Sequence, residues 1–139
     1  MIVLDTNVVS EPMRLRGDGS VQAWLDRQDA DTLYLAAPSL AELLVGVAIL
    51  PDGKRKAGLA KGLNDLLTTL FSGRILPFDQ SAAETYARLI VHARANGRAI
   101  SVADGQIAAI ATTHGFAVAT RDLAPFVATG VRVIDPWAN

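Results

Sequence analysis

Short apolar runs alternate along the chain with longer segments in which apolar residues recur at helical spacing. The runs are typical of buried strands, and the longer segments are typical of helices with one apolar face. We predict strands at residues 2–4, 33–37, 74–78, 117–119 and 131–134. We predict helices over residues 20–28, 39–50, 54–71, 81–96 and 102–114. Because strands and helices alternate without hairpin signals, we expect an α/β fold with a short, mainly parallel central sheet.

Composition narrows the class of protein. A chain of 139 residues suits one globular domain, so we expect a single domain over residues 1–139. The absence of cysteine excludes disulfides and thiolate metal ligands and suits a cytoplasmic location. The longest apolar stretch, residues 43–51, is too short to span a bilayer, so no membrane association is expected. The net charge of −1 provides no global basic field, so any nucleic acid must be recognised locally.

Acidic side chains occur where predicted strands end and where predicted helices begin. Asp5 follows the first strand directly, and Asp122 comes shortly after the fourth. Glu42 and Asp104 lie in the first turns of two predicted helices. Ligands of open parallel sheets bind outside the carboxyl ends of the strands. We therefore expect all four carboxylates near one edge of the sheet.

A structural role would also explain these acids. Helices often begin with an S-x-x-[DE] capping box, in which the acid satisfies backbone donors. Three segments match this pattern, at residues 39–42, 81–84 and 101–104. Asp5 and Asp122 could likewise cap short helices that follow them. Each acid taken singly is compatible with capping, and their joint placement at one edge favours a functional site.

Carboxylates that lie close together repel, and their pKa values rise unless a cation neutralises them. With no cysteine and two histidines, the available ligands are hard oxygens, which favour Mg²⁺ or Mn²⁺ over zinc. Such ions activate water and stabilise charge on a phosphodiester. The acidic residues therefore favour hydrolysis of a phosphate ester.

Five segments of the chain together resemble a known family. They are MIVLDTNVVSEPMR, PSLAELLVGV, ISVADGQIAAIA, VATRDLAPF and VIDPW. Their order and spacing are similar to those of PIN domains, and more narrowly to the VapC-type toxins of bacterial VapBC toxin–antitoxin pairs, in the FitB-like subgroup. The resemblance implies a three-layer α/β/α fold. It also implies an endoribonuclease, dependent on Mg²⁺ or Mn²⁺, that acts as the toxin of a type II toxin–antitoxin pair.

The resemblance assigns metal-binding roles to the acids. Asp5, Glu42 and Asp104 fall on the first three acidic positions of the family, and Asp122 best matches the fourth. Asp5 and Asp104 are expected to bind the metal directly, with Glu42 and Asp122 binding directly or through water. Relatives often carry an acid at the place of Pro125. Asp122 therefore either supplies that carboxylate or leaves this side of the site with fewer ligands.

Other residues are expected to organise the site or to contact RNA. Thr120 matches a small hydroxyl residue that helps organise the site, and Asn7 belongs to the opening motif. Candidate contacts to RNA phosphates are Arg14, Arg98 and Arg121.

The resemblance also implies partners: a VapB-type antitoxin, a second copy of the chain in a homodimer, and DNA only through the antitoxin. The predicted helix at residues 39–50 is apolar on more than one face. From periodicity alone it is either a deeply central helix or a helix that meets a partner. The resemblance favours the partner.

Two other functions fit parts of the sequence. A PIN-like interaction module would use its acids only to cap helices. A phosphotransfer enzyme would use Asp5 as a nucleophile, but Asn7 stands where a D-x-D motif places its second acid. A P-loop nucleotide-binding protein is disfavoured, because no G-x-x-x-x-G-K-[ST] segment is present.

Overall fold

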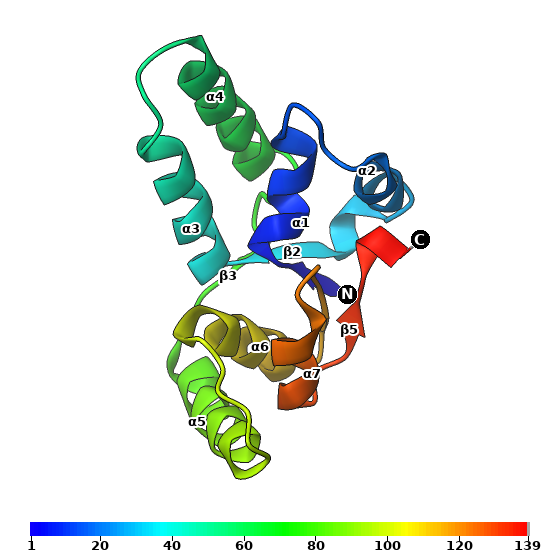
Figure 1. Cartoon of the computed structure of the whole chain (residues 1–139), viewed down its shortest axis with the longest axis vertical. Coiled ribbons are helices and arrows are strands. Elements are labelled where there is room, and N and C mark those ends of the chain that lie inside the picture. The colour runs from blue at the N-terminus through cyan, green and yellow to red at the C-terminus, as the bar shows by residue number, and fades with distance from the viewer. Residues whose placement is uncertain (139) are drawn as a thin grey trace.

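A five-stranded parallel sheet forms the centre of the protein in the computed structural model, which describes residues 1–138 (Figure 1). The strands are β1 (Ile2–Leu4), β2 (Leu33–Ala36), β3 (Ile75–Leu76), β4 (Ala117–Ala119) and β5 (Val133–Ile134). Their order in the sheet is β3-β2-β1-β4-β5, and every neighbouring pair is parallel. The predicted α/β fold with a short parallel sheet is confirmed.

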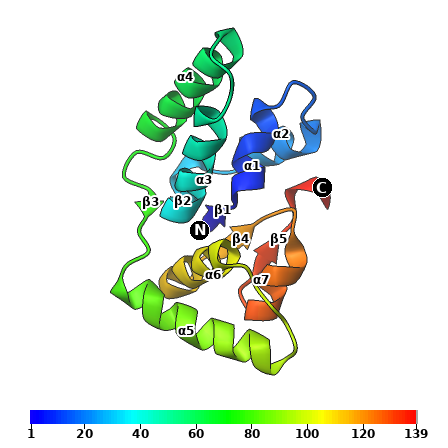
Figure 2. The ribbon, with the colours of Figure 1, turned by 60° about the vertical axis from the view of Figure 1, so that its left-hand side comes forward.

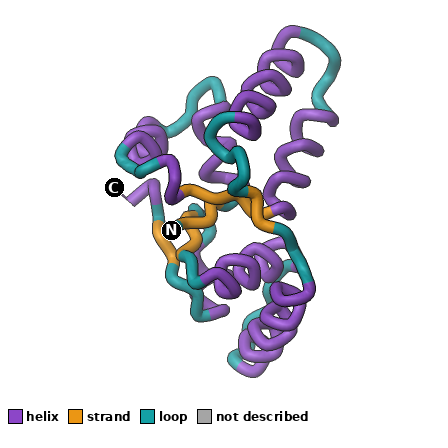
Figure 3. The backbone as a smooth tube through the Cα atoms, turned by 180° about the vertical axis from the view of Figure 1, so that it is seen from behind, coloured by secondary structure: helices purple, strands orange, loops and turns teal. Residues whose placement is uncertain are grey.

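Helices cover both faces of this sheet. One face carries α1 (Thr6–Ser10), α2 (Gly19–Asp26), α3 (Ala37–Ala48) and α4 (Lys54–Thr68). The other face carries α5 (Gln80–Ala95), α6 (Val102–His114) and α7 (Leu123–Thr129). Figures 1 and 2 show these two groups on opposite sides of the strands, and Figure 3 shows the strands between them from behind. Three short 3₁₀ helices complete the fold, at Glu11–Met13, Ala30–Thr32 and Pro136–Ala138. The layers are therefore α/β/α, as expected.

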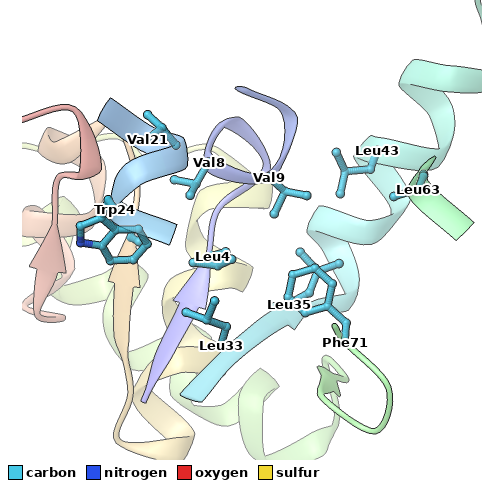
Figure 4. Close-up of a cluster of buried hydrophobic side chains, with 11 residues drawn as sticks. Leu4, Val8, Val9, Val21, Trp24, Leu33, Leu35, Leu43, Leu63 and Phe71 are labelled. Carbon is cyan, nitrogen blue, oxygen red and sulfur yellow. The ribbon is translucent and has the colours of Figure 1, made fainter. Parts of the chain in front are cut away.

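The alternation of side chains along each strand divides the core into two clusters. On the α1–α4 side, Leu4 and Leu35 pack against residues of α1 and α3, including Val9 and Leu43 (Figure 4). On the other side, the alternate strand residues Val3 and Val118 pack against α6 and against Phe126 of α7. A sheet buried on both faces explains why its strands read as continuous apolar runs.

The start of α3 differs from the prediction. We predicted a strand to residue 37 and a helix from residue 39, but the helix begins at Ala37 with Pro38 in its first turn, where proline is favoured. Ser39 is therefore inside the helix, fully buried, and its hydroxyl has no hydrogen-bond partner among residues 1–138. Glu42 lies in the second turn. The capping box predicted at residues 39–42 is wrong.

Of the other two possible capping boxes, the one at residues 81–84 is wrong, and in the one at residues 101–104 the serine does cap its helix. Helix α5 is capped by Asp79, whose side chain accepts from the N–H of Ala82, so the box at residues 81–84 is wrong. Helix α6 is capped by Ser101, whose hydroxyl oxygen accepts from the N–H of Asp104 at 3.2 Å. The remaining boundaries shift by a few residues: β3 and β5 are shorter than predicted, and α4 ends at Thr68. Within residues 1–138, no helix is both long and apolar enough to cross a bilayer.

Candidate metal centre

Asp5 lies at the carboxyl end of β1, where the strand turns into α1. Its N–H donates to the carbonyl oxygen of Ala119 at 2.9 Å, which continues the pairing of β1 with β4. Its Oδ1 accepts from the N–H of Thr6 at 2.8 Å, so Asp5 does cap α1. The side chain is buried, with 6% of its residue surface exposed. Capping uses one carboxylate oxygen and leaves the second available for another role.

The second oxygen of Asp5 belongs to a network that joins the ends of β1 and β4. Because Leu4 pairs with Ala119, the next residues of the two strands, Asp5 and Thr120, are neighbours. The Thr120 hydroxyl donates to Asp5 Oδ2 at 2.8 Å and its oxygen accepts from the N–H of Asp122 at 3.0 Å. Thr120 is fully buried. One hydroxyl group therefore links two of the predicted acidic residues.

Asn7 closes this arrangement from α1. Its side-chain nitrogen lies 3.5 Å from Asp5 Oδ2, and its Oδ1 accepts from the N–H of Arg121 at 3.3 Å. We call the set formed by Asp5, Asn7, Thr120 and the N–H groups of Arg121 and Asp122 the Asp5 network. Both residues predicted to organise the site contact Asp5.

Asp104 and Asp122 come to the same edge from the other face of the sheet. Helix α6 leads back to the start of β4, so its first turn, with Asp104, lies near the carboxyl ends of the strands. Burial raises the pKa of Asp104, and the negative charge of Asp122 raises it further, while the Ser101 hydroxyl opposes the rise. Asp122 precedes α7 but makes no capping hydrogen bond through its side chain, so the predicted capping role of Asp122 is wrong.

Asp5 is subject to the charges of the other acids. Burial is the main cause that raises its pKa, and the negative charges of Asp104 and Glu42 add to the rise. Hydrogen bonds from Thr120 and Thr6 act in the opposite direction. The structure therefore brings Asp5 within electrostatic range of Glu42 and Asp104, and Asp104 within range of Asp122.

These four acids have the chemistry of a divalent-cation site. Their donors are hard carboxylate oxygens, and none of the four forms a salt bridge within residues 1–138. A cation would relieve their repulsion and the raised pKa values of Asp5 and Asp104. However, no three acidic or histidine side chains in the described part of the chain converge closely enough to hold an ion. The fit to a metal therefore rests on donor chemistry and electrostatics.

The three predicted phosphate contacts occupy different surroundings. Arg14 forms an ion pair with Glu11, 3.3 Å between Nη1 and Oε2, and lines a groove of about 250 Å³ with Thr6 and Glu42. Arg98 lines a separate groove of about 510 Å³ between α5 and α7, together with His92. The guanidinium of Arg121 lies over the ring of Trp137, as described below.

Sequence reasoning overlooked Glu11, a buried acid that organises the segment after α1. Its Oε1 accepts from the N–H of Asp18 at 2.9 Å, and its Oε2 accepts from Arg14. Gly17 is required in this turn, because a Cβ there would lie 2.3 Å from the carbonyl oxygen of Glu11. The signal in the sequence was an acid placed directly after an apolar helix and before Pro12.

Comparison with known proteins defines the family. The PIN-domain model matches residues 2–130, and the chain belongs to the PIN-domain family, in its VapC-type group. It is 48% identical over 137 residues to VapC ribonuclease Y4jK of Sinorhizobium fredii, a match that covers 99% of this chain and 98% of the relative. It is 47% identical over 137 residues to toxin FitB of Neisseria gonorrhoeae, with 99% of each chain covered. In the solved structure of FitAB bound to an IR36 DNA fragment, one chain matches with a TM-score of 0.95 and 46% identity, covering 99% of this chain and 96% of that one.

Proposed function

We propose that this protein is an endoribonuclease that depends on Mg²⁺ or Mn²⁺ and acts as the toxin of a type II toxin–antitoxin pair. The observation that carries the proposal is the buried carboxylate of Asp5, which Thr120 holds at the sheet edge beside other acids and which forms no salt bridge within residues 1–138. The relatives named VapC ribonuclease and toxin FitB support the same activity.

Each residue of the site has a proposed role. Asp5 and Asp104 would hold the ion directly, and Glu42 and Asp122 would bind it directly or through water. When bound, a divalent ion supplies Lewis acidity and a water of lowered pKa for attack on an RNA phosphodiester. The Thr120 hydroxyl stabilises the ionised form of Asp5 by donating to Oδ2, which keeps that carboxylate competent to bind a cation.

The arginines supply positive charge around the acids. Arg14 lines the same groove as Glu42, which supports our proposal that it binds an RNA phosphate beside the site. Arg121 is part of the Asp5 network through its backbone. Arg98 lines a groove that contains no acid, and we propose it as a contact for a more distant phosphate.

An antitoxin is the proposed protein partner. Helix α3 exposes Leu44 and Val45, at 49% and 59%, and Ile49, directly after the helix, is 76% exposed. The reading of α3 as a deeply central helix is therefore wrong. Such residues are available to a VapB-type antitoxin or to a second copy in a homodimer. The solved structure of a relative, FitAB bound to an IR36 DNA fragment, supports an antitoxin partner. We propose that DNA is contacted only through that antitoxin. A single domain over residues 1–139 and a cytoplasmic location remain predictions.

The proposal is tested by RNA cleavage with three matched proteins: wild type, Asp5→Asn and Asp52→Asn. Asp52 is a fully exposed acid before α4 and serves as the control for loss of one charge. We expect cleavage by wild type and Asp52→Asn with Mg²⁺, none with EDTA, and a loss of about 100-fold or more in Asp5→Asn. Full Mg²⁺-dependent activity of Asp5→Asn would contradict the assignment.

A second candidate is a PIN-like interaction module. Two observations favour it: Asp5 does cap α1, and no three acids converge on one point within residues 1–138. A folded wild-type protein that cleaves no RNA and binds no divalent ion would support this alternative.

A further inference from the structure

The side chain of Arg121 leaves the backbone in the middle of the Asp5 network. The residues on either side, Thr120 and Asp122, are joined by the Thr120 hydroxyl, and the N–H of Arg121 donates to Asn7 Oδ1. The backbone at position 121 is therefore held in place from both sides. The direction of the Arg121 side chain is thus a consequence of the site itself.

The guanidinium of Arg121 lies over the indole of Trp137, with 5.3 Å from Cζ to the ring centroid. Trp137 is in the 3₁₀ helix that follows β5, where its backbone N–H donates to Asp135 Oδ1 at 2.9 Å. Its ring packs against the core cluster on the α1–α4 side, to which Trp24 of α2 belongs. Segments 110 or more residues apart along the chain, α2 and the 3₁₀ helix at Pro136–Ala138, are in contact here. Trp137 is therefore a firmly held platform.

Asp18 lies within electrostatic range of this guanidinium. Hydrogen bonds from Ser20 lower the pKa of Asp18, and the positive charge of Arg121 lowers it further. By contrast, Arg121 forms no salt bridge with any acid within residues 1–138, Asp5 and Asp122 included. The Arg121 backbone therefore belongs to the Asp5 network, whereas its guanidinium is directed to Trp137 and does not neutralise the acids of the candidate metal centre.

Stacking on an indole suits a phosphate-binding arginine. The guanidinium is planar, and its N–H donors point outward in that plane, so a ring against one face leaves the donors available. A side chain ordered before the ligand arrives loses less conformational freedom on binding. An arginine held in this way binds phosphate more tightly than one that must be ordered by the ligand.

We propose that Trp137 is a positioning residue for RNA binding: it holds the guanidinium of Arg121, whose backbone lies in the Asp5 network, in the orientation in which it binds a phosphate of the RNA strand. This inference rests on the proposed function for its ligand. It adds the C-terminal 3₁₀ helix to the parts of the chain on which RNA recognition depends.

The test is a double-mutant cycle in binding of a labelled single-stranded RNA oligonucleotide. All variants carry Asp5→Asn, so that the RNA is not cleaved. We expect Arg121→Gln to weaken binding about tenfold and to reduce the salt dependence of log K by about 0.7, the loss of one phosphate contact. Trp137→Leu should weaken binding several-fold when Arg121 is present and should have no further effect in the Arg121→Gln background.

Two conservative variants separate positioning from simple packing. Trp137→Phe keeps an aromatic face and should restore most of the affinity lost in Trp137→Leu. Arg121→Lys keeps the charge but loses the planar stack, and it leaves the core untouched, so it remains informative even if Trp137→Leu fails to fold. We expect Arg121→Lys to bind almost as weakly as Arg121→Gln.

Three results would overturn the inference. The first two are an RNA affinity equal to that of the Asp5→Asn parent in Arg121→Lys or in folded Trp137→Leu. The third is an equal loss of affinity from Trp137→Leu whether residue 121 is Arg or Gln. Cleavage by wild type and Asp5→Asn reports separately on the proposed function. If wild type cleaves RNA and Asp5→Asn does not, while the cycle shows no coupling, only the role of Trp137 is wrong. If the cycle shows coupling but wild type does not cleave, the positioning role stands and the nuclease is wrong.

Discussion

The two sides of the candidate metal centre are held by different forces. On one side, the Asp5 network is buried and connected by hydrogen bonds between the ends of β1 and β4. On the other, Glu42 and Asp104 project from helices. Glu42 is exposed and its side chain makes no hydrogen bond within residues 1–138, and the Asp104 contact is a backbone cap. Strand register therefore places one set of acids, whereas helix packing places the other.

This difference indicates how the site would assemble. The Asp5 network is complete without a ligand, because every link in it is a hydrogen bond within the chain. The helix acids have room to adjust, and no three acids yet converge within residues 1–138. Asp5 would therefore hold a cation from a position fixed by hydrogen bonds, whereas Asp104 and Glu42 would hold it from helices.

Breaking the Asp5 network should have the largest effect on stability and on RNA cleavage. Thr120→Val keeps the shape of a fully buried side chain but leaves Asp5 Oδ2 and the N–H of Asp122 without this partner. We expect a loss of about 1–3 kcal/mol in the free energy of unfolding and about 100-fold in Mg²⁺-dependent cleavage. Denaturant unfolding and RNA cleavage measure the two effects.

Thr129→Val is the matched control, because this buried hydroxyl donates only to the carbonyl oxygen of Phe126 in α7. It should lose stability and retain cleavage. Equal cleavage in Thr120→Val and Thr129→Val would show that the network has no functional role.

Disturbing the packing of α6 against α5 should have an intermediate effect on RNA cleavage. A Cβ at Gly105, the residue after Asp104, would lie 2.8 Å from Tyr86 Cε2 and 3.0 Å from Ile90 Cδ1 of α5. Gly105→Ala should therefore push α6 from α5 and lower the free energy of unfolding by about 1–3 kcal/mol. Cleavage should fall less than in Thr120→Val, because the Asp5 network remains.

The control for this change is Gly58→Ala in α4, where a Cβ meets nothing within 4 Å. It should raise the free energy of unfolding by about 0.5–1 kcal/mol, since alanine favours a helix over glycine. If Gly105→Ala is as stabilising as Gly58→Ala, the close approach of α5 and α6 does not determine where Asp104 lies.

Removing the charge of Asp5 should have the smallest effect on stability, and the size of that effect depends on pH. Burial raises the folded-state pKa of Asp5 above its unfolded value, so the stability linked to its protonation is present at low pH and lost as the pH rises through the folded-state pKa. In EDTA, Asp5→Asn should therefore stabilise the protein at neutral pH, and the gain should vanish as the pH falls below the unfolded-state pKa. Thermal unfolding across this pH range measures it.

Glu42→Gln supplies the comparison from the exposed side of the site. Its effect should stay within about 0.5 kcal/mol at every pH, as for most surface substitutions. A pH-independent loss of stability in Asp5→Asn would mean that the carboxylate of Asp5 acts as a helix cap whose charge is needed.

The sequence predicted the fold and the edge at which the acids gather, because apolar periodicity and strand–helix alternation report the layers directly. It did not predict which serines cap helices. Pro38 begins α3 earlier than the S-x-x-E pattern indicated, and Asp79 replaces Ser81 as the cap of α5. A capping pattern is local, and neighbouring residues decide which member of it is used.

The contacts that build the site could not be predicted from the sequence, for a different reason. The hydrogen bond from Thr120 to Asp5 depends on the register of β1 against β4, which neither strand specifies alone. The contact of the Arg121 guanidinium with the Trp137 ring depends on where the pairing of β5 with β4 places the 3₁₀ helix that follows β5. Such contacts join distant segments, so they follow from the assembled sheet.

The most direct test of the central claim is calorimetric titration of Mn²⁺ into wild type, Asp5→Asn and the control Asp52→Asn. If the acids form a metal centre built on Asp5, wild type and Asp52→Asn should bind the ion and Asp5→Asn should not. Absence of binding to wild type, or equal binding to wild type and Asp5→Asn, would contradict the account.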